Sequence, residues 1–335
     1  MPGNSNLHMS RAGRQDEFYT QLSTIEDELC HYREYFRDKI IFCNADDPAI
    51  GEDGQDHYGD GQGAFTSNFF RYFQLNFMEL GLKKLITTHF DPQKRSYKFE
   101  IVSGDEGDQI GLPGYVKTYL DGNGDFRSPE CMALLDECDL VVTNPPFSLM
   151  REYMPLLVEK GKQFIILGNM NHITLKELLH LFMEGKMWLG YNSGHFWFNV
   201  PDYYEEKKTD FKIIDGQKMR RMGNCCWFTN LDIQIRHHPL DLFKRYTPEE
   251  FPTYDNYPAI HINRVCDIPC DYYGIMAVPI TFMAQFCPEQ FQILGDNRYH
   301  DGQEFADDIN VINGKTQYRR ILIKRIDGGE HHDAD

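Results

Sequence analysis

The sequence predicts an α/β fold in which helices cover both faces of a mostly parallel sheet. The main observation is that short apolar runs alternate with segments of helical spacing over about the first 185 residues. The composition agrees, because 41% of the 335 residues are hydrophobic and 25% are charged, which is typical of a globular chain with a sizeable core.

The first elements are a helix and a strand. Apolar residues at helical spacing from Thr20 to Arg37 predict a helix, and the run Lys39–Cys43 predicts a short buried strand. The segment Asp46–Thr66 has the composition of a loop. Ser67 can cap a further helix that runs to about Leu80.

The same alternation continues to residue 184. Its expected elements are, in order, strand Leu85–Phe90, helix Pro129–Cys138, strand Leu140–Thr143, a helix to about Lys160, strand Phe164–Leu167 and helix Thr174–Glu184. Beyond residue 185 the pattern changes to short aromatic strands such as Phe196–Phe198 and Cys226–Phe228. We therefore divide the chain into a flexible arm (1–15), a core (16–185) with an acidic insertion at about 49–66, a second region (186–325) and an acidic tail (326–335).

Composition also narrows the class of protein. No apolar run reaches the roughly 18 residues of a membrane span, and the N-terminus lacks the apolar segment of a secretory signal. Nine cysteines at irregular spacing fit reduced thiols, so we expect a cytoplasmic protein. We expect no metal site, because His261, Cys266 and Cys270 lack a second Cys-x-x-Cys pair.

The motif that carries chemistry is Asn144-Pro145-Pro146-Phe147, directly after a predicted strand. Sites in open α/β sheets form at this carboxyl edge. Two prolines lock the backbone, so the Asn144 side chain and the Pro145 carbonyl become two acceptors at a fixed separation. Such a pair suits a planar NH2 group, whose nitrogen lone pair would then point at an electrophile. Phe147 offers a flat face for a heteroaromatic ring.

The electrophile that fits best is the methyl group of S-adenosylmethionine. Asp46-Asp47-Pro48 follows the first strand, where a carboxylate can receive the ammonium or ribose hydroxyls of the cofactor. Asp125-Phe126 could serve the adenine ring, and the segment Asp16–Thr20 could close over the methionine end. An Asp in a Gly-rich loop is also a common turn former, so each of these assignments has a purely structural alternative.

Several segments together resemble one family. They are Asp16–Gln21, Cys43–Pro48, Ser67–Phe70, Gly124–Ser128 and Val141–Tyr153, followed by Trp188–Gly190, Trp227–Asp232, Tyr254–Tyr257, Val278–Phe282, Pro288–Phe291 and Arg319–Lys324. These segments look like the EcoRI-type adenine-specific DNA methyltransferases, over roughly residues 16 to 325. The resemblance implies a Rossmann-like, S-adenosylmethionine-dependent methyltransferase sheet followed by a C-terminal target-recognition region.

The resemblance also implies the roles of individual residues. The family transfers a methyl group to N6 of adenine in duplex DNA, and the target base must leave the stack to reach the methyl donor. Asn144, Pro145, Pro146 and Phe147 would hold that base. The cofactor side would comprise Tyr19, Thr20, Asn44, Asp46, Asp47, Pro48, Asp125 and Phe126.

The remaining contacts to DNA are expected in the second region. Phe147 would form one jaw of an aromatic clamp, and the other would come from Phe196, Trp197 or Phe198. Basic residues there could contact phosphates, although a solvated surface explains any one of them equally well; the candidates are Lys218, Arg220, Arg221, Arg319 and Arg320.

The net charge of −17 argues against a uniformly basic DNA-binding protein. Ten of the acids lie in two stretches without Lys or Arg, Asp46–Asp60 and Asp327–Asp335, so the excess is partly local. We expect double-stranded DNA as partner, no membrane, a monomer, and a role in restriction-modification or in a phage or mobile element, with any cognate restriction endonuclease acting separately. Methylation of RNA or of a protein amide, and a non-catalytic DNA-binding relic, are the alternatives.

Overall fold

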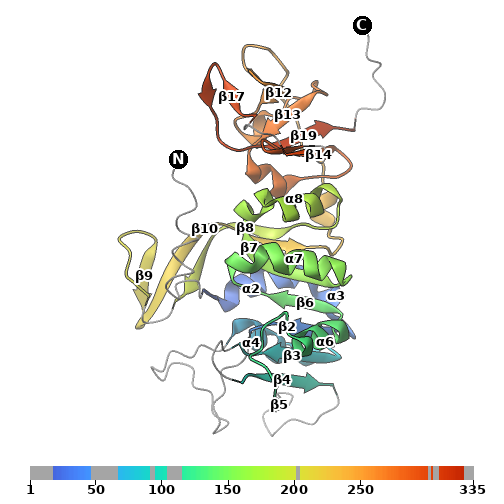
Figure 1. The fold of residues 1–335 in the computed structure, drawn as a ribbon, viewed down its shortest axis with the longest axis vertical. Helices are drawn as coiled ribbons and strands as arrows, with labels where there is room; N and C mark the ends of the chain where they lie inside the picture. The colour runs from blue at the N-terminus through green and yellow to red at the C-terminus, as the bar shows by residue number, and fades with distance from the viewer. Residues whose placement is uncertain are drawn as a thin grey trace. The chain divides into compact units, whose positions relative to one another are not determined.

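The protein divides into two compact units, described here from a computed structural model (Figure 1). The first comprises residues 1–169 and 190–229, and the second comprises 170–189 and 230–335. The structure describes residues 18–46, 67–90, 95–103, 115–200, 204–300, 303–304 and 309–327.

A ten-stranded mixed sheet forms the centre of the first unit. Its strands are, in spatial order, β1 (Tyr19–Thr20), β8 (Trp188–Asn199), β10 (Gln217–Thr229), β7 (Gln163–Asn169), β6 (Leu140–Thr143), β2 (Ile40–Cys43), β3 (Lys84–Thr88), β4 (Tyr97–Val102) and β5 (Val116–Tyr119), with β9 (Phe211–Ile214) paired to β10 alone.

Only the four central strands, β7, β6, β2 and β3, are parallel, so the sheet is mixed where the sequence favoured a mostly parallel one. The pairs β3–β4, β4–β5, β7–β10 and β1–β8 are antiparallel. The alternation of strand and helix correctly marks the parallel centre, because parallel neighbours need a crossover connection. The alternation does not predict β4 and β5, because these strands lie in a stretch whose sequence has the composition of a loop.

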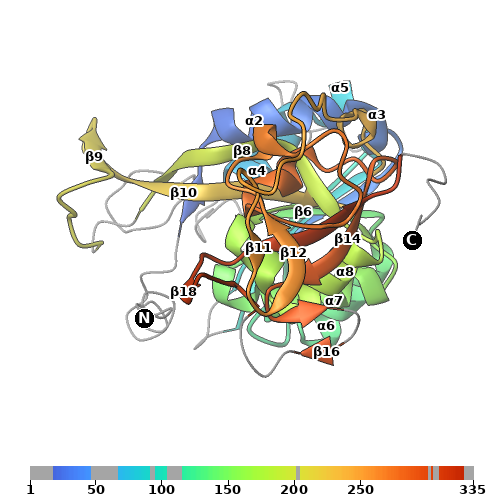
Figure 2. The ribbon, with the colours of Figure 1, turned by 90° about the horizontal axis from the view of Figure 1, so that it is seen from above.

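Helices cover both faces of this sheet (Figure 2). On one face lie α2 (Leu22–Leu29), the 3-10 turn η1 (Cys30–Tyr32), α3 (Arg33–Phe36), α4 (Asn68–Leu75) and α5 (Phe77–Leu80); on the other lie α6 (Pro129–Glu137) and α7 (Met150–Glu159). Ser67 caps α4 through its hydroxyl, which accepts from the Phe69 N–H at 3.1 Å, as the sequence predicts. The helix expected over 20–37 is instead interrupted by η1.

The core of this unit lies between the central strands and the helices. Ile41, Leu140, Val142 and Ile165 are fully buried on adjacent strands. Aromatic residues fill much of the remaining space, and those with the largest buried side chains are Trp227, Tyr32, Phe36, Phe42, Phe69, Phe70, Phe73, Phe77, Phe99, Phe164, Phe198 and Phe228. This accounts for the high aromatic content of the chain.

The second unit contains two further sheets. The larger is ordered β11 (Thr253–Tyr254), β12 (Tyr257–His261), β13 (Ile275–Val278), β19 (Ile321–Arg325), β14 (Phe291–Asp296), β15 (Tyr299–His300) and β16 (Gln303–Glu304), and the smaller pairs β17 (Val311–Ile312) with β18 (Lys315–Thr316). The helical elements are η3 (Met170–Thr174), α8 (Lys176–Met183), η4 (Gln234–His237), η5 (Val265–Asp267) and η6 (Ile280–Gln285). Its core includes Tyr254, Ala259, Ala277 and Leu322.

A fully buried carboxylate joins α2 to β8 inside the first unit. Glu28 accepts hydrogen bonds from the Tyr32 hydroxyl (2.7 Å), from the backbone N–H groups of Tyr191 (2.9 Å) and Asn192 (2.8 Å), and from the Asn192 side chain (2.9 Å). Burial raises the pKa of Glu28, while these four donors favour its ionised form. Gly190 leaves room for the carboxylate, because a Cβ there would lie 2.1 Å from Glu28 Oε1.

Glu28→Gln should destabilise the fold by about 1–3 kcal/mol, because the amide NH2 would face a buried donor and leave it unpaired. The free energy of unfolding from urea denaturation measures the effect, with the exposed neighbour Glu26→Gln as the matched control. Equal stability of the two variants would contradict this account of Glu28.

Candidate functional site

The Asn144–Phe147 motif leaves the carboxyl end of β6, in the parallel centre of the sheet. Pro145 is buried and Pro146 is exposed. The Leu149 N–H donates to the Pro146 carbonyl at 2.8 Å, which begins the 3-10 turn η2 (Phe147–Leu149). Because each proline fixes φ and lacks an N–H, the loop leaves the strand in one backbone conformation.

The side chain of Asn144 is oriented by β1 and the residue before it. Its Nδ2 donates to the Phe18 carbonyl at 2.8 Å and to the Thr20 hydroxyl at 3.2 Å. Within the described part of the chain, no donor reaches Asn144 Oδ1. An amide whose NH2 is held in this way presents its oxygen as an acceptor in a fixed direction.

The turn after β2 contacts the same strand end through Asp46. Its carboxylate accepts from the Ser67 hydroxyl at 2.7 Å and from the Thr143 hydroxyl, which also lies 2.9 Å from the Asn44 carbonyl. Thr143 directly precedes Asn144. The predicted cofactor residue Asp46 is therefore joined to the predicted catalytic loop through a single side chain.

The same turn is also held by β3. The Thr88 hydroxyl donates to Asn44 Oδ1 at 2.8 Å and accepts from the Ala45 N–H at 3.0 Å. Ala45 has a φ of 59°, a left-handed conformation that sharply bends the chain after the strand. The parallel strands β2, β3 and β6 thus end at one edge, with their terminal polar groups bonded to one another.

Asp125 and Phe126 follow a glycine that no other residue could replace. Gly124 has a φ of 81°, and a Cβ there would lie 2.0 Å from the His89 carbonyl, just beyond β3. The Asp125 carboxylate binds Arg127 in a bidentate pair at 2.9 and 2.8 Å, and this guanidinium lowers the pKa of Asp125. The Phe126 ring packs edge-on against Tyr153 at 5.1 Å.

Aromatic rings gather beside the catalytic loop. Phe18 stacks on Phe147, with ring centroids 6.4 Å apart and planes inclined by 28°. It also contacts the rings of Phe198 at 5.9 Å and Tyr204 at 6.2 Å. The sequence analysis assigned no separate role to Phe18. Its ring contacts join residues that are far apart in the chain, so only the fold reveals them.

The second jaw of the aromatic clamp is expected to come from Phe196, Trp197 or Phe198. All three lie on β8, but their environments differ. Phe198 is fully buried behind Phe18, whereas Phe196 and Trp197 are half-buried. The Trp197 ring lies under the ammonium of Lys212, at 4.0 Å from the ring centroid. Their roles stay a prediction.

Most of the basic residues expected to meet phosphate already have protein partners. In the first unit, Lys218 donates to the Tyr204 carbonyl at 3.1 Å, Arg220 to the Thr209 carbonyl at 2.6 Å, and Arg221 pairs with Asp210 at 3.5 Å.

The two arginines of the second unit are more deeply placed. Arg319 pairs with the buried carboxylate of Asp296, and burial lowers the pKa of Arg320. The Arg320 backbone supports the end of β14, because its N–H donates to the Asn297 side chain and its carbonyl accepts from the Asn297 N–H at 3.3 Å. Their expected contacts with phosphate are not tested by this arrangement.

Three of the expected cofactor residues remain to be placed. Tyr19 pairs in register with Asn199 of β8. Asp47 and Pro48 lie outside the described residues, as do the acidic insertion, the N-terminal arm and almost all of the acidic tail.

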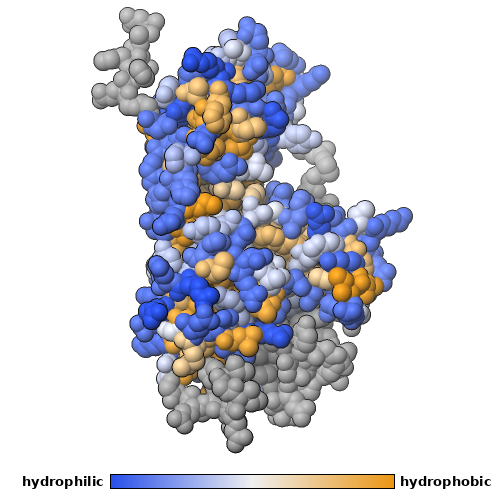
Figure 3. All heavy atoms as spheres, turned by 180° about the vertical axis from the view of Figure 1, so that it is seen from behind, coloured by the Kyte–Doolittle hydropathy of each residue, from blue (hydrophilic) through white to orange (hydrophobic). Residues whose placement is uncertain are grey.

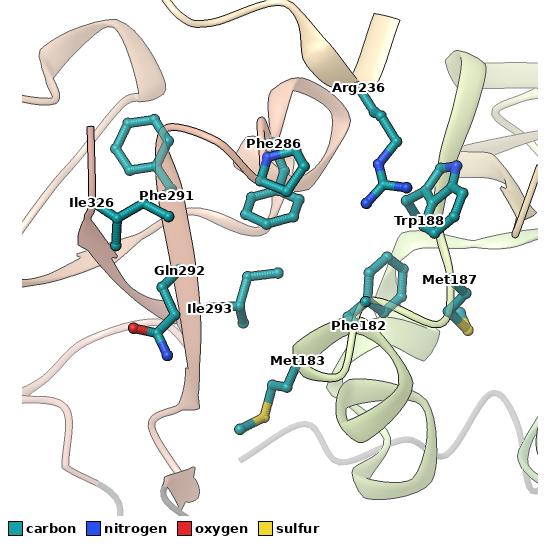
Figure 4. Close-up of a pocket in the computed structure, with 12 residues that line it drawn as sticks. Phe182, Met183, Met187, Trp188, Arg236, Phe286, Phe291, Gln292, Ile293 and Ile326 are labelled. Atoms are coloured by element: carbon teal, nitrogen blue, oxygen red, sulfur yellow. The ribbon is translucent and has the colours of Figure 1, made fainter. Parts of the chain in front are cut away.

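The second unit contains an apolar pocket around Trp188 (Figure 4). The Arg236 guanidinium lies over the Trp188 ring at 3.5 Å, and the Trp188 indole N–H donates to the Leu231 carbonyl at 2.8 Å. The pocket is further lined by Phe182, Met183, Gly185, Met187, Phe286, Pro288, Phe291, Gln292, Ile293 and Ile326. Among the residues that line it, Arg236 is the charged one and there is no carboxylate.

Two further features are absent from the described ranges. No group of three or more His, Cys, Asp or Glu residues there is placed to hold a metal ion. None of the helices there has the length and apolar character needed to cross a membrane.

The geometry at the carboxyl edge supports one kind of chemistry. The end of β6 has a fixed amide oxygen, a proline-locked loop and an aromatic face. The Asp46 carboxylate is hydrogen-bonded to Thr143, the residue directly before Asn144. This arrangement can hold a planar amino group and a stacked ring without removing a proton beforehand.

Comparisons with known proteins agree with this chemistry. A family model described as "Adenine-specific methyltransferase EcoRI" matches residues 6–326. The chain is 41% identical to the Type II methyltransferase M.EcoRI of Escherichia coli, over 96% of each chain. It is 33% identical to M.MgeORF184P of Mycoplasma genitalium and to M.MpnI of Mycoplasma pneumoniae, both Type II methyltransferases, over 95% of this chain and 98% of each relative. No solved structure matches the chain.

Thr143→Val should lower the free energy of unfolding by about 1.5–3 kcal/mol, because the Asp46 carboxylate loses a buried donor while the shape of the side chain is kept. Chemical denaturation measures this, and Thr118→Val on the exposed strand β5 is the matched control. If both valine variants unfold at the same denaturant concentration, the Thr143 hydroxyl does not hold the two loops together.

Proposed function

The chain belongs to the EcoRI family of adenine-specific methyltransferases, and on that premise we propose that it methylates N6 of a flipped-out adenine at a specific sequence of duplex DNA. The methyl donor is S-adenosylmethionine. The relatives named above are Type II methyltransferases, so a role in restriction-modification fits this chain as well.

The observation that carries the proposal is the orientation of Asn144. Both hydrogen bonds of its NH2 group go to the segment at β1, so Oδ1 remains as an acceptor, and the carbonyl of the next residue, Pro145, supplies the second acceptor. The two oxygens take the two hydrogens of the adenine amino group. The nitrogen lone pair is thereby withdrawn from the ring and directed at the methyl carbon, and the amino group needs no prior deprotonation.

The residues on the cofactor side suit S-adenosylmethionine by their chemistry. Asp46 is a half-buried carboxylate at the carboxyl edge, Asn44 lies beside it, and Phe126 offers an aromatic ring. A carboxylate can accept hydrogen bonds from the ammonium group or the ribose hydroxyls of the cofactor, and an aromatic ring can pack on its adenine. When bound, the cofactor supplies an activated methyl group.

The flipped base is held between aromatic faces. Phe147 supplies one face, and we assign the other to Phe18, whose ring already stacks beside it at 6.4 Å. Two faces in contact with an inserted ring lie about 7 Å apart, so a small movement of Phe18 admits a base. Phe198 is less suited, because it is fully buried behind Phe18.

The proposed DNA substrate also indicates where the enzyme acts. We propose that it acts on DNA in the cytoplasm, as a monomer and separately from any cognate endonuclease. Lys218, Arg220 and Arg221 contribute contacts with phosphate.

One assay separates this function from methylation of RNA or of a protein amide, and from a non-catalytic relic. The purified protein is supplied with S-adenosylmethionine labelled in the methyl group and with unmethylated duplex DNA, RNA or protein. We expect label in duplex DNA, as N6-methyladenine. Label only in RNA or protein, or in none of the three, would contradict the proposal.

Asn144→Ala should abolish methyl transfer and leave the cofactor affinity unchanged, because it removes an acceptor for the adenine amino group, whereas the Asp46 carboxylate keeps its hydrogen bonds from Ser67 and Thr143. Steady-state kinetics measures transfer, and isothermal titration with S-adenosylmethionine measures binding. Asn76→Ala, at the end of α4, is the control and should keep full activity. Transfer at the normal rate by Asn144→Ala would refute the proposed mechanism.

Phe18→Ala should lower kcat/KM for duplex DNA by about 5- to 150-fold, because stacking of a base on an aromatic ring is worth roughly 1–3 kcal/mol. Phe196→Ala is the matched comparison on β8, and circular dichroism checks the fold of both. A larger loss with Phe196→Ala than with Phe18→Ala would assign the second jaw to β8, as the sequence predicts.

A further inference from the structure

A two-stranded ribbon extends from the sheet of the first unit. β9 pairs only with the first residues of β10, and the two strands project away from their neighbours (Figures 1 and 2). They are joined by Asp215 and Gly216, whose φ values of 50° and 82° are typical of the tight type I′ turn of a β-hairpin. We call residues 211–220 the β9–β10 ribbon.

The end of the β9–β10 ribbon is apolar and open to solvent. Ile213 is 52% exposed and Ile214 is 47% exposed. Hydrophobic atoms gather at the end of this arm in Figure 3. These two isoleucines at the end of a projecting hairpin contribute little to the core and are available for contact with another molecule.

Cations lie behind this apolar end on both faces of the ribbon. Residues directly paired across the strands share a face, and the register pairs Ile213 with Lys218, Lys212 with Met219, and Phe211 with Arg220. Only the first pair after the turn, Ile214 with Gln217, has no cation. The ribbon thus has apolar side chains at its end and basic side chains along its length.

We propose that the β9–β10 ribbon enters the major groove of the DNA substrate, where Ile213 and Ile214 contact the base edges while Lys212, Lys218 and Arg220 reach the phosphates. This inference rests on the proposed function. It makes the ribbon a sequence-reading element that is separate from the catalytic loop.

The dimensions of the ribbon favour the major groove over the minor groove. The major groove of B-form DNA, about 12 Å wide, admits a two-stranded ribbon without deformation, whereas the minor groove, about 6 Å wide, has to be widened first. The groove is about 8.5 Å deep, and a strand rises about 3.4 Å per residue, so the first two pairs after the turn reach the base edges. The third and fourth pairs, which carry Lys212 and Arg220, then lie level with the phosphates at the rim. Lys218 lies one pair nearer the turn, about 3.4 Å deeper, and its side chain is long enough to span that distance.

The residues at the end of the ribbon match what this groove displays. Isoleucine methyl groups suit the methyl group of thymine, and the carboxylate of Asp215 can accept from the amino group of cytosine. The alternative occupant is a second copy of the chain, paired along the free edge of β9. In such a pairing the cations of one ribbon would face the cations of the other, and two chains of net charge −17 also repel each other, so the charges favour DNA over a second copy.

The test is the double variant Ile213→Ser/Ile214→Ser in the full chain. Its matched control is Val116→Ser/Tyr119→Ser, which replaces two side chains of similar exposure (55% and 49%) on β5 of the same unit. The target sequence of the parent protein is first mapped by sequencing methylated adenines in DNA from cells that express it. Then kcat/KM is measured on duplexes with that sequence and with single base-pair changes.

We expect the ribbon variant to lose roughly tenfold or more in kcat/KM on the target duplex and to discriminate less among the changed duplexes, with unchanged S-adenosylmethionine affinity and thermal stability. The β5 control should behave like the parent protein. A ribbon variant with parental kcat/KM and discrimination would overturn the ribbon's role and leave the proposed function standing. A parent protein that methylates no DNA would overturn both.

Sedimentation of the parent and the ribbon variant tests the alternative occupant. We expect both to sediment as monomers. A parent dimer that dissociates in the ribbon variant would show that a second copy covers the isoleucines, and would overturn the assignment to DNA.

Discussion

The hydrogen bonds from Asn144 to the Phe18 carbonyl and the Thr20 hydroxyl are the contacts on which the proposed chemistry depends. An asparagine side chain can turn either its oxygen or its NH2 toward a substrate. Because the NH2 is already bound to the segment at β1, the oxygen faces outward. A short segment near the start of the chain therefore determines that a loop more than 120 residues later presents a hydrogen-bond acceptor, and not a donor, to the substrate.

The second constraint is the arrangement of parallel strands that end at one edge. β2, β3 and β6 place Asn44, Thr88 and Thr143 next to one another, and each makes a hydrogen bond to another of these loops. Asp46 belongs to the same network through Thr143. The proposed cofactor side and the catalytic loop thus form one connected structure.

The acidic character of the chain is compatible with a polyanionic substrate because charge is distributed unevenly along it. Ten acids lie in two stretches without Lys or Arg, whereas the β9–β10 ribbon has a cation on each of three successive pairs.

The sequence by itself determined the parallel centre of the sheet, the position of the Asn144–Phe147 motif at a strand end, and the family. These features are local: hydrophobic period, proline geometry and short motifs are set by neighbours in the chain. The interruption of the first helix, the antiparallel strands β4 and β5, the contact of Phe18 with Phe147 and the burial of Phe198 behind Phe18 were decided only by the tertiary structure. Each depends on packing between residues far apart in sequence, and such packing overrides the local pattern because burial of a whole aromatic side chain outweighs any single backbone preference.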